Sequence, residues 1–191
     1  MATISRIGFG QVEPNHLSAQ RTAQIYAQLP AKSDIKILEN GQYVKYDYAN
    51  NEVNYTGEGE WMMVFNEVKL YDDFWKESYK DYAMQAKDFT PGSDSITHDG
   101  VGPFKGQMTP RVIKTNIGDI YTTNAIGVGN TDGKSQVVYD GDVTVGKKLT
   151  VNDKGFLVVN EAPEATDMVW QVVKVYTMAD GQAAVKLQRI Q

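Results

Sequence analysis

The sequence of 191 residues contains no cysteine, only two histidines and no long apolar run. Without cysteine, the chain can form no disulfide bond, thiolate nucleophile or cysteine-ligated zinc site. His16 and His98 have no companion at metal-ligand spacing, so we expect no metal and no cofactor. The longest apolar runs, such as residues 61–65, are far shorter than the roughly 20 residues that cross a bilayer, so we expect no membrane-spanning segment.

The sequence also lacks a basic cluster and an export signal. Its net charge of −5 disfavours direct nucleic-acid binding, which normally requires a basic stripe or patch. The first residues show no basic stretch followed by a continuous apolar segment, so secretion is not predicted.

The residues that are present indicate a folded, β-rich protein. Hydrophobic residues make up 41% of the chain and charged residues 23%, as in globular domains. Asn40-Gly41 and Asp180-Gly181 each separate two runs of apolar or aromatic residues, which predicts hairpin turns. Further strand-like runs lie at residues 43–48, 53–56, 61–70, 111–115, 136–139, 142–145, 148–151, 156–159, 168–178 and 182–190.

One segment has the periodicity of a helix. Between residues 71 and 87, Trp75, Tyr79, Tyr82 and Ala83 recur at spacings of three and four, and an aspartate can cap the first turn. We predict one amphipathic helix there.

Composition also indicates where the chain divides. Residues 89–106 are rich in glycine and proline, which predicts a joint between two units. The predicted fold is therefore mainly β with one amphipathic helix. It comprises an extended N-terminal arm (1–30), an α+β domain built from a β-meander and the helix (31–97), and a small C-terminal β-sandwich or barrel (98–191).

No motif for catalysis is recognisable. Glycine-rich stretches at residues 129–135 and 141–148 come close to a phosphate-binding loop, but no helix is predicted to follow either of them, so both are interpreted as turns. Tyr43, Tyr46 and Tyr48 with Trp61 could form an aromatic platform for a sugar, although cross-strand packing is the commoner use of such residues. We expect a protein that is not an enzyme.

The N-terminal arm has a broken apolar pattern. Glycines and a proline interrupt its apolar residues, and only residues 17–29 could form a short helix. Such a segment either lies across its own domain or buries its apolar groups on a neighbouring subunit, and we favour the second interpretation. The predicted partner-binding residues of the arm are Arg6, Ile7, Phe9, Leu17, Arg21, Tyr26 and Leu29.

Several stretches resemble structural proteins of tailed-bacteriophage heads, of the small auxiliary or decoration kind. They are GFGQVEPNHLSAQRTAQIYAQLP, ENGQYVKYDY, GEWMMVFNEVKLY and GDVTVGKKLTVNDKGFLVVN. The resemblance implies a virion component, assembled in the host cytoplasm, that binds and stabilises the head shell. Its implied partners are the major capsid protein and other copies of itself.

Two alternatives remain open at this stage. A head–tail joining protein or a tail structural protein could carry the same arm and the same β-rich units. A carbohydrate-binding module, built on the tyrosines and Trp61, would belong to another functional class.

Overall fold

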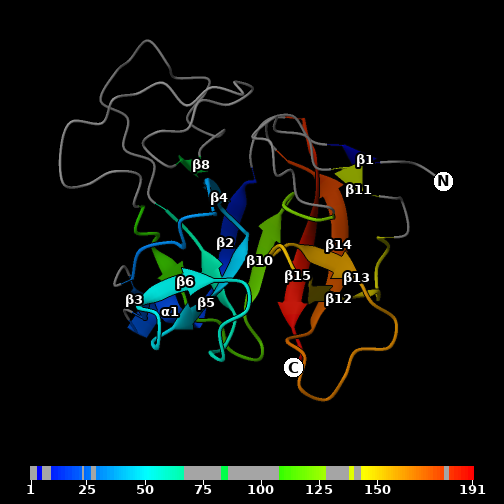
Figure 1. Cartoon of the computed structure of the whole chain (residues 1–191). Helices are drawn as coiled ribbons and strands as arrows, with labels where there is room; N and C mark the ends of the chain where they lie inside the picture. Colours follow the sequence, from blue (N-terminus) through cyan, green and yellow to red (C-terminus); the bar gives the residue numbers. More distant parts are fainter. Residues whose placement is uncertain are drawn as a thin grey trace, which may run out of the picture.

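The computed structural model describes residues 4–5, 10–22, 24–26, 29–66, 83–85, 108–127, 138–139, 143–178 and 181–191. Within these ranges the protein is mainly β, as predicted, with two antiparallel sheets and one short helix, α1 (Ser18–Thr22) (Figure 1). No helix in these ranges is long and apolar enough to cross a membrane.

The larger sheet contains six of the described strands and is antiparallel throughout. Its order is β13 (Leu157–Val159), β12 (Lys148–Val151), β14 (Trp170–Thr177), β15 (Ala183–Arg189), β10 (Ile120–Thr123) and β2 (Val12–His16). The long hairpin β14–β15 closes at Gly181, whose φ of 86° suits glycine, and thus confirms the turn predicted at Asp180-Gly181.

The second sheet contains five of the described strands. Its order is β3 (Ile25–Tyr26), β9 (Val112–Ile113), β7 (Met62–Val64), β5 (Tyr43–Asp47) and β6 (Glu52–Asn54). Two short pairs complete the described strands: β1 (Ile4–Ser5) with β11 (Val138–Tyr139), and β4 (Ile37–Glu39) with β8 (Ala83–Gln85).

Side chains of the five-stranded sheet alternate between two hydrophobic clusters, as the two-residue period of a strand requires. Tyr43, Met63 and Ile113 face the first cluster, where they meet Tyr121 and Trp170 of the six-stranded sheet. Their neighbours in sequence, including Val44, Val64 and Val112, face a second cluster on the opposite side. The first cluster therefore joins the two sheets, and the second covers the outer face of the smaller one.

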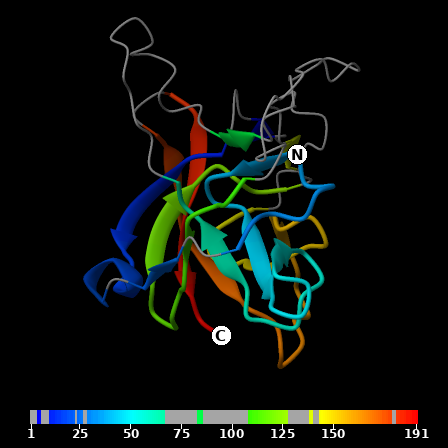
Figure 2. The same cartoon turned by 60° about the vertical axis from the view of Figure 1, so that its left-hand side comes forward.

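The predicted arm does not stand apart from this core. Its β2 pairs with β10 at the end of the six-stranded sheet, and its β3 pairs with β9 at the end of the five-stranded sheet. Figure 2 shows β2, in dark blue, lying along β10. Leu17 is 2% exposed inside the first cluster. Residues 10–22 and 24–26 thus pack across their own chain, which is the other interpretation considered from the sequence.

A buried carboxylate fixes the turn between β2 and α1. Asp119, which is 2% exposed, accepts hydrogen bonds from the Ser18 N–H at 2.9 Å and the Ser18 hydroxyl at 3.0 Å. It also accepts one from the Asn116 N–H at 2.9 Å. The beginning of the helix is therefore held by a residue that comes a hundred positions later in the chain.

Strands of the two predicted domains are interleaved. The strands β9 and β10 both follow residue 98, yet β9 belongs to the five-stranded sheet and β10 borders the N-terminal β2. The predicted joint at residues 89–106 lies outside the described residues. The described strands on its two sides share both sheets and one core.

The predicted helix is replaced by a strand in the part that is described. Residues 83–85 form β8, which pairs antiparallel with β4, and Leu38 lies opposite Met84. Leu38 and Glu39 are buried, so the backbone N–H and C=O groups of β4 need hydrogen-bond partners from another strand. Residues 83–85 supply this strand, although the spacing of apolar residues in their segment predicts a helix. The rest of the predicted helix, residues 71–82 and 86–87, lies outside the described residues.

Candidate functional site

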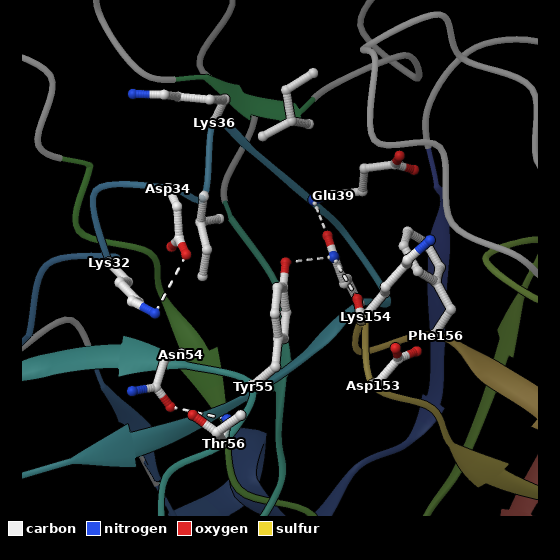
Figure 3. A pocket seen from close by; sticks show the side chains of 13 residues that line it. Lys32, Asp34, Lys36, Glu39, Asn54, Tyr55, Thr56, Asp153, Lys154 and Phe156 are labelled. Atoms are coloured by element: carbon white, nitrogen blue, oxygen red, sulfur yellow. Dashed lines mark hydrogen bonds and ion pairs between the residues drawn. The ribbon is translucent and has the colours of Figure 1, made fainter.

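A cavity of about 310 Å³ lies between the loop before β4, the strand β6 and the turn that precedes β13 (Figure 3). We call it the Gln42 cavity. Its walls are formed by Lys32, Asp34, Ile35, Lys36, Ile37, Glu39, Gln42, Asn54, Tyr55, Thr56, Asp153, Lys154 and Phe156.

Gln42 fixes the inner end of this cavity. A tight turn brings it there: the Gln42 N–H donates to the Glu39 carbonyl at 3.2 Å, and Gly41 adopts a φ of 87°. The side-chain amide then donates to the Tyr55 hydroxyl and to the Lys154 carbonyl, each at 2.8 Å, and its oxygen accepts the Glu39 N–H at 3.0 Å. One side chain therefore ties together three separate segments.

Tyr55 presents its hydroxyl at the cavity wall in the neutral form. Burial raises its pKa well above the ordinary value, and the negative charges of Glu39 and Asp34 add to the increase, while the hydrogen bond from Gln42 opposes it. Gln42 donates to the phenol oxygen, so the phenol proton is available to a ligand in the cavity.

Charges of both signs surround the cavity. Lys32 and Asp34 form an ion pair at 3.2 Å, and Lys154 and Asp153 lie on the opposite wall (Figure 3). The Glu39 carboxylate accepts the Gly10 N–H at 2.8 Å, which makes it part of the support for the N-terminal segment. Within the described ranges, no three His, Cys, Asp or Glu side chains are grouped to hold a metal ion.

A second cavity of about 260 Å³ lies on the five-stranded sheet, and we call it the tyrosine cavity. Its walls are formed by Tyr26, Tyr46, Tyr48, Gly59, Glu60, Met62 and Lys114. The rings of Tyr46 and Tyr48 meet edge to face with centroids 5.6 Å apart, and Tyr48 is 69% exposed. The cavity therefore offers exposed aromatic surface to solvent.

An ion-pair network forms the polar side of the tyrosine cavity. One oxygen of Glu60 lies 3.2 Å from the Lys114 ammonium, and the other lies 3.1 Å from the Arg189 guanidinium. Arg189 is itself held by Thr115, to whose hydroxyl it donates at 3.0 Å. Two cations thus share one carboxylate, and of the three side chains Glu60 and Lys114 line the cavity.

The structure separates the predicted partner-binding residues from one another. Leu17 is buried in the first cluster, whereas Arg21 is exposed in the last turn of α1. Tyr26 and Leu29 are half-buried against the second cluster. Leu17 is therefore a core residue of this chain. Arg6, Ile7 and Phe9 lie outside the described residues.

The aromatic platform considered from the sequence does not form. Tyr43 is fully buried in the first cluster, because it points to the face of β5 opposite to Tyr46. Trp61 is partly buried, and the Lys45 ammonium lies 4.8 Å from the centre of its ring. Tyr46 and Tyr48 do lie together, but their aromatic neighbour in the tyrosine cavity is Tyr26.

The sequence alone did not indicate the polar residues of either cavity. Gln42, Glu60 and Lys114 are common surface types with no distinctive spacing. The only signal in the sequence was the pair of glycines close to Glu60, because glycine allows two backbone segments to approach each other closely. A Cβ on Gly57 would lie 2.7 Å from the Tyr46 carbonyl oxygen. That contact brings Glu60 next to the tyrosines.

Comparisons with protein-family models, with curated proteins and with solved structures find no match to this chain. The site must therefore be interpreted from its own geometry and from the sequence.

Proposed function

We propose that this chain is a non-enzymatic structural protein of a tailed-bacteriophage virion, and that it is an auxiliary protein that binds and stabilises the head shell. Its partners would be the major capsid protein and other copies of itself, and it would join the particle in the host cytoplasm. The proposal rests first on the resemblance of four stretches of the sequence to proteins of this kind.

The position of the N-terminal segment is the structural observation that carries the proposal. The stretch that begins this resemblance supplies the terminal strand of both sheets, β2 and β3. The last three residues of β2, Pro14 to His16, are exposed, and so is Arg21 in α1. A shell protein needs such a rigid, exposed edge, because an ordered surface loses less conformational entropy on binding.

Arg21 is the described arm residue that remains available to a partner. Arg6, Ile7 and Phe9, which precede this edge in the chain, complete the proposed contact surface. A contact dominated by apolar side chains should survive salt, because screening weakens ion pairs far more than apolar burial.

Sedimentation with shells tests the proposal. Purified protein is added to tailed-phage capsids assembled without it, and the bound fraction is measured with the natural protein, with Arg21→Glu and with Lys148→Glu. Lys148 is an exposed lysine on β12, away from β2 in the same sheet, so it controls for charge. We expect saturable binding that Arg21→Glu weakens and Lys148→Glu leaves unchanged.

Two results would contradict this function. Absence of binding to capsids would exclude the head-shell role, and equal weakening by both variants would exclude the β2 edge as the contact. Electron microscopy of labelled particles shows the position of the bound protein. Label confined to the head–tail junction or the tail would favour a joining or tail protein.

A further inference from the structure

We propose that the tyrosine cavity binds one pyranose ring, either a single sugar or the end of a glycan. This inference does not depend on the virion proposal, because it rests on the surfaces, charges and size of the cavity alone.

The aromatic walls suit the apolar face of a sugar. A pyranose ring presents axial C–H groups on one face and hydroxyl groups around its edge, so it stacks on an aromatic ring while its edge bonds to polar groups. Tyr48 offers most of its surface to solvent, and its edge-to-face contact with buried Tyr46 fixes one side of it. An exposed ring that is already ordered costs little entropy when a ligand stacks on it.

The turn after β5 holds Tyr48 in this position. The Asp47 carboxylate accepts hydrogen bonds from the Asn50 N–H at 3.1 Å and from the Asn50 amide at 2.8 Å. Asn51 adopts the left-handed conformation with a φ of 53°, which closes the turn. The backbone that carries Tyr48 is therefore well defined.

The polar wall suits hydroxyl groups better than a cation. Cages of aromatic side chains commonly bind quaternary ammonium groups. Here, however, Glu60 is shared between Lys114 and Arg189, so two positive charges oppose a cationic ligand. A neutral sugar can donate to the Glu60 carboxylate and accept from the Lys114 ammonium, and both side chains are about 40% exposed and within reach of solvent. An acidic sugar is also compatible with this charge.

The size of the cavity limits the ligand to one ring. Its volume of about 260 Å³ lies just below the usual range of small-molecule pockets, roughly 300–1,000 Å³. Further sugar units of a longer glycan would extend over the exposed side of Tyr48.

Binding measurements on the full chain test the proposal. An array of neutral, N-acetylated and acidic oligosaccharides identifies the preferred class. Saturation-transfer NMR then measures the binding of glucose, N-acetylglucosamine and glucuronate. Tetramethylammonium is measured in the same way, as the representative of cationic ligands. We expect at least one of the sugars to bind in the millimolar range, and tetramethylammonium to bind more weakly or not at all.

Variants locate the bound sugar. Tyr48→Ala should weaken binding by about tenfold or more, because it removes the stacking surface, whereas Tyr48→Phe should retain binding. Ile117→Ala is the matched control, since Ile117 is 71% exposed and lies outside the cavity. Equal circular dichroism spectra and unfolding midpoints will show that the exposed substitutions leave the fold intact.

Three outcomes would overturn the proposal. They are the absence of binding by any sugar at millimolar concentration, sugar binding that Tyr48→Ala does not affect, and tighter binding of tetramethylammonium than of every sugar. The last result would make the cavity a cation cage.

Discussion

The hydroxyl oxygens of Tyr43 and Tyr121 lie 2.9 Å apart and share a hydrogen bond in the centre of the protein. Tyr43 belongs to β5 of the five-stranded sheet, and Tyr121 belongs to β10 of the six-stranded sheet. Both rings also contact Trp170, Tyr121 edge to face at 4.8 Å and Tyr43 tilted at 6.3 Å between centroids. The two sheets are therefore joined by one polar contact inside an apolar cluster.

The shared hydrogen bond should couple the effects of removing the two hydroxyls. Tyr121→Phe leaves the buried Tyr43 hydroxyl without its partner, and we expect a loss of about 1–3 kcal/mol in the free energy of unfolding. The double variant Tyr43→Phe with Tyr121→Phe should lose less than the sum of the single variants. Urea unfolding measures all three, with Tyr48→Phe as an exposed control. Strict additivity would contradict the shared hydrogen bond.

Gly155 should tolerate substitution less well than Gly146. Its φ is 77°, its carbonyl accepts the Tyr43 N–H at 2.7 Å, and an added Cβ would overlap the Tyr43 carbonyl oxygen. We expect Gly155→Ala to cost about 3 kcal/mol or more.

Gly146 is the control for this substitution. It also has a positive φ, of 92°, but an added Cβ would meet no atom within 4 Å. Gly146→Ala should therefore cost only the backbone strain, about 1–2 kcal/mol. Thermal unfolding compares the stability of the two variants. Equal losses of stability would show that the backbone shifts enough to remove the overlap between the Cβ of residue 155 and the Tyr43 carbonyl oxygen.

Three buried tyrosines predict a loss of stability at alkaline pH. Burial raises the pKa of Tyr43, Tyr55 and Tyr121 well above the ordinary value of about 10, so these phenols stay protonated in the folded protein. The stabilisation is complete below pH 10 and decreases above it, where the unfolded chain loses these protons. The slope is about 1.4 kcal/mol per pH unit for each tyrosine.

The ultraviolet absorbance of tyrosinate measures this effect. Of the eleven tyrosines, Tyr43, Tyr55 and Tyr121 should ionise only together with unfolding. If all eleven tyrosines ionise in one step while the circular dichroism spectrum remains that of the folded protein, burial does not protect Tyr43, Tyr55 and Tyr121 from ionisation.

The N-terminal segment should be required for folding. Leu17→Ala removes a buried side chain from the first cluster, and we expect a loss of about 2–5 kcal/mol. Arg21→Ala, four residues later and exposed, should change stability by less than about 0.5 kcal/mol. Deletion of residues 1–22 removes β2 and α1 and should leave no cooperative unfolding transition. A truncated chain that still unfolds cooperatively would show that the segment is dispensable.

Local signals in the sequence predicted part of this fold. Asp180-Gly181 marked the hairpin β14–β15, and on β15 the buried residues Val185 and Leu187 alternate with polar neighbours. On β14 burial does not follow such a strict alternation. A register shift between Val172 and Lys174 leaves Val172 buried and Val175 38% exposed. A bulge of this kind depends on the partner strand and has no signature in β14 itself.

Strand β10 was missed because two of its three buried residues are polar. Thr122 and Thr123 are fully buried, and their hydroxyls donate to the Asn15 side chain at 2.8 Å and to the Gln11 carbonyl at 2.6 Å. Hydrogen bonds to the N-terminal segment make this burial possible, and no pattern of hydropathy shows them. The same bonds explain why the segment lies on its own chain. Its contacts with the rest of the chain are polar as well as apolar.

The interleaving of early and late strands also affects how the chain is made. Gln11 and Thr123 are bonded neighbours, yet they stand 112 positions apart. A ribosome that adds about 5–20 residues per second therefore releases β2 several seconds before its partner β10 exists. During that interval the N-terminal half has incomplete sheets and an unfilled core. The two sheets can be completed only after almost the whole chain has emerged, so unpaired strand edges stay exposed during synthesis.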